Sequence, residues 1–346
     1  MDFVASSKLF RGTNIAVHGK SVASSCCAHL LGGAGFPLCW KEGDRPRVPA
    51  ILLSEDTQAL LCDLYGRPEL FHGLFRIDRR VVAWGSGVTP VELPHRALVI
   101  SEEALLQRLD PKLVEDPAPE RAHWTIYASR PLPVSGAEHR FGSRAATATP
   151  VHLTGSTSPA CLIESLESGW LFLVPESAGT GWLIAVGESL ESHLAQSRLI
   201  AKQCEISGAT QAAFPAYPRI VDPVCGPGWL ACGTAALAFD PLCGDGTGYA
   251  VREAILAAAV IRAAACSDDV ERLLAHYRAR LIAGFLRHLE LCRGFYASGG
   301  AGPWWKQEAA ALAEGIAWCG RALPAVSPFQ YRLNGFDLEP IPVTPS

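Results

Sequence analysis

Apolar runs and helical patterns alternate along the first part of the chain. Asn14–Val17 is a short apolar run typical of a strand, and Val22–Leu31 carries small and apolar residues at helical spacing. Glycines end that helix and Phe36–Trp40 predicts a second strand, so the chain opens as a β-α-β unit. The same patterns predict helices at Ala59–Tyr65 and Glu102–Leu109 and strands at Arg80–Trp84, Arg96–Ile100 and Trp124–Ala128.

The pattern predicts mainly strands in the middle of the chain and mainly helices in its last third. Strands are expected at Ala160–Glu164, Trp170–Pro175 and Gly181–Gly187, followed by a helix over Ser189–Cys204. A buried strand at Trp229–Cys232 then leads to a long alanine-rich helix that ends at Ala265. Helices are expected to dominate from there to residue 323.

These elements predict an α/β (α+β) fold in which a Rossmann-like dinucleotide domain is interrupted by an antiparallel-sheet insert. We assign residues 1–60, 96–130 and 219–267 to the discontinuous dinucleotide domain and residues 61–95 and 131–218 to the sheet-rich substrate domain. Residues 268–346 form a helical C-terminal region.

Composition excludes two classes of partner. Of the 346 residues 49% are hydrophobic and 18% charged, the net charge is −4, and lysine and arginine are scattered, so no nucleic-acid surface is expected. No uncharged stretch approaches the roughly 20 apolar residues of a membrane helix, and the first residues lack the apolar core of an export signal. We therefore expect a cytoplasmic protein without a membrane partner.

Cysteine and histidine spacing gives no sign of a metal centre. The twelve cysteines form no C-x-x-C pair, and the ten histidines include no H-x-x-x-H pair. Cysteines among apolar residues behave as small hydrophobes. Reduced, buried thiols are the expectation, and no metal site is predicted.

The loop after the first strand lies where a dinucleotide fingerprint, G-x-G-x-x-G, would bind a pyrophosphate. Here it reads His18-Gly19-Lys20-Ser21-Val22-Ala23, so all three motif glycines are replaced. Lys20 would either obstruct the pyrophosphate or provide a cation for it. The predicted cofactor contacts in this loop are Gly19, Lys20, Ser21 and Ala23. A nucleoside-triphosphate loop is disfavoured, because it would need glycine at Asn14.

A second glycine-rich segment carries the strongest signal. It runs from Gly228 to Ala236 as G-W-L-A-C-G-T-A-A and continues from Asp240 to Gly246 as D-P-L-C-G-D-G before the long helix. This closely resembles the second flavin motif, G-D-A-A with D-P-x-x-G-x-G, of the FAD-dependent monooxygenase and halogenase superfamily. The alternative is an ordinary glycine-rich turn between strand and helix.

The resemblance implies a fold like that of para-hydroxybenzoate hydroxylase and a flavin at the start of the long helix, where backbone N–H groups favour negative charge. The usual Asp after the first glycine is replaced by Thr234. The implied cofactor contacts are Gly233, Thr234, Asp240, Pro241, Gly244, Asp245, Gly246 and Thr247.

Weaker resemblances concern the substrate side. Gly169–Pro175 is similar to the G-W-x-W-x-I-P segment of flavin-dependent halogenases and implies a substrate-lining role for Trp84, Trp170, Phe172 and Pro175, although an aromatic core wall fits the same pattern. The position comparable to the halogenase lysine holds Arg80, which disfavours halogenation because arginine stays protonated.

Two functions remain open from sequence. The first is an FAD-dependent oxidoreductase, a monooxygenase of an aromatic small molecule or of a peptide- or carrier-bound aromatic residue, reduced by NAD(P)H or by a separate flavin reductase. The second is a flavoprotein-derived scaffold without redox chemistry, since the altered positions His18, Lys20, Ala23, Ser129 and Thr234 all bear on one ligand. No catalytic residue is identified; Glu253 could donate a proton or could be solvated or ion-paired.

Overall fold

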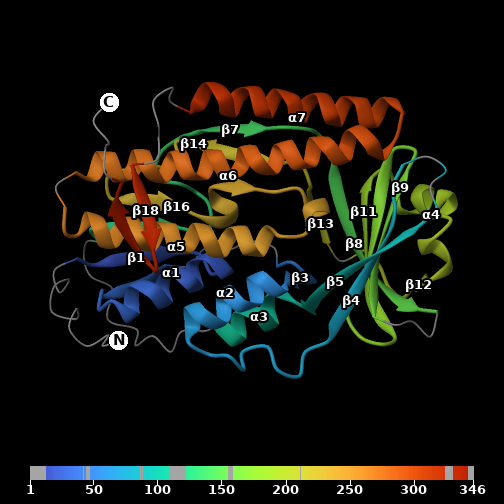
Figure 1. Ribbon diagram of the computed structural model, residues 1–346, viewed down its shortest axis with the longest axis horizontal. Coiled ribbons are helices and arrows are strands. Elements are labelled where there is room, and N and C mark those ends of the chain that lie inside the picture. The colour runs from blue at the N-terminus through green and yellow to red at the C-terminus, as the bar shows by residue number, and fades with distance from the viewer. Residues whose placement is uncertain are drawn as a thin grey trace.

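A computed structural model describes residues 13–41, 43, 47–85, 87, 89–109, 122–154, 159–210, 212–267, 269–323 and 330–341. The helices α5, α6 and α7 lie one above another along the molecule, and a large sheet stands across one end of them (Figure 1). None of the helices in this part of the chain combines the length and apolar character that crossing a bilayer requires. The N-terminal residues in which we expected no export signal lie mostly outside it.

The first sheet has five strands and is parallel at its centre, as a dinucleotide fold requires. Its order is β15-β16-β6-β1-β2, and β1 pairs in parallel with both β2 and β6. The strands are β1 (Ile15–His18), β2 (Leu38–Lys41), β6 (Trp124–Tyr127), β15 (Cys225–Gly226) and β16 (Trp229–Ala231). The helix α1 (Val22–Gly33) connects β1 to β2 and packs on α5 (Gly246–Ala264).

The second sheet has nine strands, in the order β12-β8-β11-β10-β9-β4-β5-β3 with β13 also paired to β8. The strands are β3 (Ile51–Ser54), β4 (Arg76–Ala83), β5 (Val91–Ile100), β8 (Ala145–Leu153), β9 (Ala160–Leu166), β10 (Gly169–Pro175), β11 (Thr180–Gly187), β12 (Cys204–Ile206) and β13 (Ala212–Pro215). Residues 51–54 and 96–100, expected in the dinucleotide domain, therefore contribute strands to the large sheet. The division into domains as a whole stays a prediction.

Both faces of β10 are covered, which explains its uninterrupted apolar sequence. Side chains alternate along a strand, so Trp170 and Phe172 belong to the main core, whereas Leu171 and Leu173 belong to a smaller cluster on the other face. The large sheet is thus buried on both faces at β10.

Smaller sheets and the remaining helices complete the fold. The three-stranded sheet is β17-β14-β7, and β18 and β19 form a hairpin beside α5. The bounds are β7 (Ala137–Arg140), β14 (Arg219–Asp222), β17 (Leu237–Ala238), β18 (Tyr331–Asn334) and β19 (Asp337–Pro340). The helices are α2 (Glu55–Tyr65), α3 (Glu102–Leu109), α4 (Leu190–Gln196), α6 (Val270–Gly299) and α7 (Pro303–Ala322), with short 3-10 turns η1 (Ile200–Lys202), η2 (Gly233–Ala235) and η3 (Pro241–Cys243).

The predicted length of one helix was wrong. The helix predicted over Ser189–Cys204 ends at Gln196, and Cys204 begins a strand. The buried carboxylate of Glu164, on β9, accepts hydrogen bonds from the backbone N–H groups of residues 198, 199 and 200. Backbone N–H groups that donate to a side chain are not available for the i to i−4 hydrogen bonds of a helix, so the helix does not continue through these residues.

The C-terminal helices are joined to the sheets by a fully buried ionic network. The guanidinium of Arg144, just before β8, donates from Nε to Asp240 Oδ2 at 2.7 Å and from Nη1 to Glu308 of α7. Glu308 also accepts from the N–H and the hydroxyl of Ser143, and Tyr296 Oη of α6 donates to Asp240 Oδ2 at 2.9 Å. Buried charges are tolerated only when paired in this way.

We expect Glu308→Ala to lower the free energy of unfolding by about 3 kcal/mol or more, because removing one partner leaves the buried Arg144 charge under-compensated. The exposed Glu314 on the same helix is the matched control, and Glu314→Ala should change stability by less than about 0.5 kcal/mol. Urea denaturation of both variants measures the difference. If both variants lost the same free energy of unfolding, the ionic network around Arg144 would contribute nothing to stability.

Candidate functional site

The turn that leads into α5 is shaped by side chains that point away from it. Asp240 Oδ1 accepts the Leu242 N–H at 2.8 Å at the start of η3, and Gly244 adopts the left-handed conformation with φ +68°. Asp245, at the N-cap of α5, makes no side-chain capping bond. Its carboxylate instead accepts from Thr57 Oγ1 at 2.9 Å and pairs with Arg252. The first N–H groups of α5 therefore lack the usual cap.

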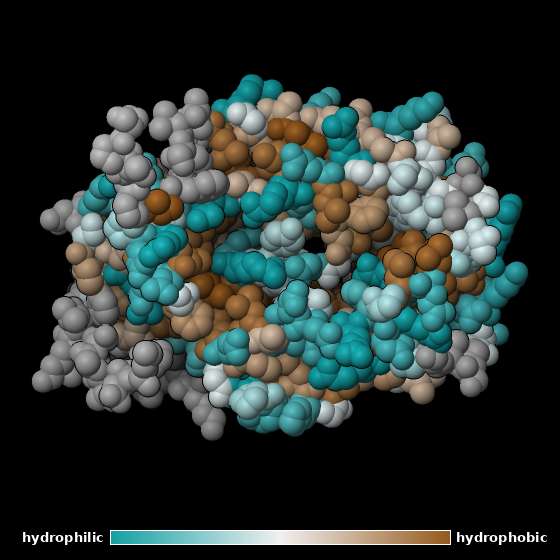
Figure 2. Space-filling view, in the orientation of Figure 1, coloured by the Kyte–Doolittle hydropathy of each residue, from teal (hydrophilic) through white to brown (hydrophobic). Residues whose placement is uncertain are grey.

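Gly246 opens α5 onto free space. A Cβ built on Gly246 meets no atom of the described residues within 4 Å, and its φ is not positive, so none of these residues requires glycine there. At Gly248, in contrast, a Cβ would lie 2.2 Å from Asp245 Oδ1 and 2.6 Å from Thr57 Oγ1. Figure 2 shows a gap near the middle of this face, between α5 and the strands of the large sheet. Gly246 thus leaves room for a ligand to approach the backbone.

Arg80 and His95 face this turn from the large sheet. Arg80 Nη2 lies 3.4 Å from a Cβ built on Gly244 and 3.1 Å from His95 Nε2. Burial, with a further contribution from the charge of Arg80, lowers the pKa of His95 to about 4. The imidazole is therefore neutral near pH 7, and its Nε2 accepts from Arg80. Sequence reasoning noted Arg80 but missed His95, which no motif marks.

Of the four residues expected to line a substrate, Phe172 packs against Arg80. The Arg80 guanidinium carbon is 6.0 Å from the centre of the Phe172 ring. Trp170 is fully buried and donates from Nε1 to Tyr296 Oη at 3.1 Å. Trp84 donates from Nε1 to the Phe295 carbonyl at 3.0 Å. Both tryptophans therefore bind the sheet to α6. This is the packing role that the sequence left open as an alternative to lining a substrate.

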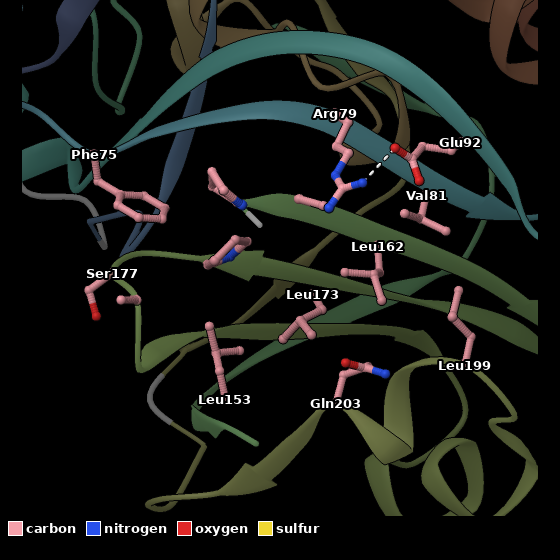
Figure 3. Close-up of a pocket in the computed structure, with 14 residues that line it drawn as sticks. Phe75, Arg79, Val81, Glu92, Leu153, Leu162, Leu173, Ser177, Leu199 and Gln203 are labelled. Carbon is pink, nitrogen blue, oxygen red and sulfur yellow. Dashed lines mark hydrogen bonds and ion pairs between the residues drawn. The ribbon is translucent and has the colours of Figure 1, made fainter. Parts of the chain in front are cut away.

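Pro175 lies on the opposite face of the large sheet, where it lines a separate cavity of about 320 Å³ (Figure 3). Leu162 and Leu173 face this cavity, and Arg79 forms an ion pair with Glu92 at 2.6 Å at its side. Because neighbouring residues of a strand point to opposite faces, Leu173 and Phe172 cannot line the same space. This cavity is distinct from the gap beside α5.

The loop after β1 is closed by its own neighbours. A Cβ on Gly19 would lie 2.3 Å from Ser129 Oγ, and one on Gly43 would lie 2.0 Å from the same atom. Ser129 Oγ is itself 3.0 Å from His18 Nδ1. The carboxyl ends of β1, β2 and β6 therefore meet around the Ser129 hydroxyl. Lys20 is exposed beside them, and its carbonyl accepts from Arg47.

Ser21 and Ala23 serve the packing of α1. Ser21 Oγ accepts the Ser24 N–H at 3.1 Å and Ser24 Oγ accepts the Ser21 N–H at 2.8 Å, which forms a reciprocal cap. Ala23 is buried, and its Cβ would lie 3.1 Å from a Cβ on Gly233. The structure thus brings the first glycine-rich segment against the second.

Gly233 is held by a buried carboxylate. Its N–H donates to Glu253 Oε2 at 2.8 Å, while the neighbouring Thr234 is exposed on η2. Burial raises the pKa of Glu253 to about 8, although the Gly233 N–H acts in the opposite direction. Glu253 is therefore protonated near pH 7 and is not solvated.

The other residues expected to contact the cofactor lie on different sides of the turn before α5. Thr247 lies half-buried in the first turn of α5, and Pro241 begins η3. Asp240 is 2% exposed and points into the Arg144 network, so it shapes the turn from below. Gly244, Gly246 and Thr247 are brought together on the open side of the turn.

Comparison with known proteins identifies the fold. No protein-family model matches the sequence, and no curated protein is significantly similar to it. A peptidyl tryptophan dihydroxylase essential for tryptophylquinone cofactor biogenesis is 20% identical over 86% of this chain and 78% of its own, with a TM-score of 0.68. The flavin-dependent halogenase CmlS is 15% identical over 88% and 70%, with a TM-score of 0.73. The p-nitrophenol 4-monooxygenase of Pseudomonas putida is 15% identical over 90% and 96%, with a TM-score of 0.64.

These likenesses confirm the expected fold, which is the α/β fold of FAD-dependent halogenases and hydroxylases. At such identities they establish the architecture and leave the chemistry to the residues of the site.

The buried Glu253 makes stability depend on pH. The native carboxyl keeps its proton up to about pH 8, whereas the unfolded one loses it near 4.5, so the native state binds more protons between these values. The free energy of unfolding should fall as the pH rises through this interval, by at most about 1.4 kcal/mol per pH unit. Glu253→Gln, which keeps an acceptor for Gly233, should flatten that slope in urea titrations, and Glu271→Gln at an exposed position should not. An unchanged slope in Glu253→Gln would contradict the assignment.

Proposed function

We propose that this protein binds FAD and acts as a flavin-dependent monooxygenase of an aromatic substrate. The observation that carries the proposal is the open backbone at Gly246, opposite Arg80, in a fold shared with FAD-dependent hydroxylases. A glycine in a helix is less stable than alanine by up to about 1 kcal/mol. No neighbour requires this glycine, so close approach of a ligand is the reason we infer for it.

The N–H groups of Gly246 and Thr247 would face the electron-rich edge of the flavin ring, with Gly244 beside them. Gly233 and Thr234 would follow the chain that links the ring to the phosphates. The phosphates would lie at the carboxyl end of β1, near Gly19, Lys20, Ser21 and Ala23. Asp240, Pro241 and Asp245 would hold the turn in shape.

Reduced FAD supplies the electrons that activate O₂ for insertion into an aromatic ring. The residues of this chain provide the surroundings for that chemistry. Backbone N–H groups at the start of α5 stabilise negative charge without reorganising. Arg80 contributes a permanent positive charge on the opposite side, and neutral His95 holds it there by accepting its hydrogen bond at Nε2.

The position of Arg80 favours oxygenation over halogenation. It lies beside Gly244, and a guanidinium that stays protonated cannot carry an oxidised halide as an amine does. The substrate would be a small aromatic molecule or an aromatic side chain of a peptide, the kind of substrate acted on by the peptidyl tryptophan dihydroxylase. NAD(P)H or a separate flavin reductase would supply the electrons.

A second candidate, a scaffold derived from a flavoprotein, is favoured by the loop after β1. There the Ser129 hydroxyl lies against Gly19 and Gly43, at the carboxyl end of β1 where the phosphates of FAD would lie. A scaffold would keep the fold and the turn at Gly246 and would have no use for the cofactor.

Binding of FAD decides between the two. Protein purified under reducing conditions should show flavin absorbance near ~450 nm, or acquire it on addition of FAD, and release FAD on denaturation. Added FAD should also raise the melting temperature of flavin-free protein, because it binds the folded state alone. A colourless protein whose melting temperature FAD does not change would refute the enzyme and leave the scaffold.

Gly246→Ala should separate stability from binding. The added methyl group has room in the free protein, so the free energy of unfolding should stay constant or rise by up to about 1 kcal/mol. The same methyl group would stand between backbone and flavin, and FAD affinity measured by fluorescence titration should fall by about tenfold or more.

Gly294→Ala is the matched control, because Gly294 is also an exposed helical glycine with open space at its Cβ. Its FAD affinity should equal that of the wild type. If Gly246→Ala binds FAD as tightly as Gly294→Ala does, the flavin does not approach the start of α5.

A further inference from the structure

Three sulfur and nitrogen ligands converge where η3 contacts α6. Cys243 comes from η3, and His288 and Cys292 lie one helical turn apart on α6. Cys292 Sγ is 3.4 Å from Cys243 Sγ and 3.3 Å from His288 Nε2, and the three ligand atoms all lie within 4.8 Å of one another. The two helical positions share one face because they are four residues apart.

The separations match those that a tetrahedral cation imposes. Zinc binds cysteine sulfur at about 2.3 Å and histidine nitrogen at about 2.0–2.1 Å, which places neighbouring ligand atoms roughly 3.5–3.8 Å apart. The two separations measured from Cys292 Sγ therefore need to open by only a few tenths of an ångström, and all three ligand atoms already lie within 4.8 Å of one another. His288 and Cys292 are about 1% exposed or less, so their backbones and rotamers are fixed by packing.

We propose that Cys243, His288 and Cys292 bind a thiophilic divalent cation of the zinc type. Two thiolates and an imidazole, without a carboxylate, are the donor set that such cations prefer. Cys243 is half-buried and gives the cation access from the side of the turn, where solvent would complete the coordination. The site stands on geometry alone and requires no flavin.

The cation would replace one existing hydrogen bond. His288 Nε2 now accepts the Asp240 N–H at 2.8 Å, and the same lone pair would bind the metal. In exchange, η3 would be tied to α6 by coordination through Cys243. The bound cation would thus connect the turn before α5 to α6 through Cys243, and the buried Asp240 N–H would lose its present acceptor.

Cobalt(II) is the probe that tests this site. Added without oxygen to the fully reduced, full-length protein, it should produce a thiolate-to-cobalt charge-transfer band in the near ultraviolet and visible bands of tetrahedral cobalt. Zn²⁺ should abolish these bands by displacement and raise the melting temperature. Cys292→Ser and Cys243→Ser should each lose the charge-transfer band, while Cys266→Ser, at an exposed cysteine, should keep it.

Because Cys292 is fully buried, the spectrum of Cys292→Ser is interpreted only if its circular dichroism matches that of the wild type. If it does not, the half-buried Cys243→Ser alone tests the site. Bands that persist in Cys243→Ser, or a reduced wild-type protein that gives none, would overturn the proposal. The proposal would also be overturned if the purified protein held a Cys243–Cys292 disulfide and, after reduction, bound neither Co²⁺ nor Zn²⁺. The two cysteines would then be a redox pair.

Discussion

The position of the turn before α5 depends on one buried carboxylate. Asp240 accepts hydrogen bonds from Arg144 Nε, Tyr296 Oη and the Leu242 N–H, and each of these donors belongs to a different part of the fold. A carboxylate without water must keep such partners, so the start of α5 is fixed relative to β8 and α6 together. Gly244 and Gly246 owe their placement to this constraint.

The two ends of the region expected to hold a dinucleotide differ in their packing. At α5 the helix begins uncapped by its N-cap side chain, and Gly246 has free space beyond its Cα. At β1 the helix α1 is capped by its own serines, and Ser129 fills the space next to Gly19. The same ligand would thus meet an open site at one end and would have to displace a hydroxyl group at the other.

The large sheet separates two environments. Its inner face presents Arg80 and Phe172 toward the turn before α5, and its outer face contributes Leu173 to a separate apolar cavity. The helix α6 joins the same turn from behind, through His288 and Cys292. Residues distant in sequence thus contact the turn from the large sheet and from α6, while its side at Gly246 stays open, so its chemistry depends on the packing of the whole molecule.

The sequence by itself determined the opening β-α-β unit, the apolar strand β10 and the glycine-rich turns, because periodicity, glycine and proline act over a few residues. Only the tertiary structure decided which way side chains point. Asp240 meets Arg144 across 96 residues, Cys243 meets Cys292 across 49, and Glu164 ends the expected helix after Gln196 from a neighbouring strand. Such contacts depend on strand register and helix packing, which leave no local pattern in the sequence.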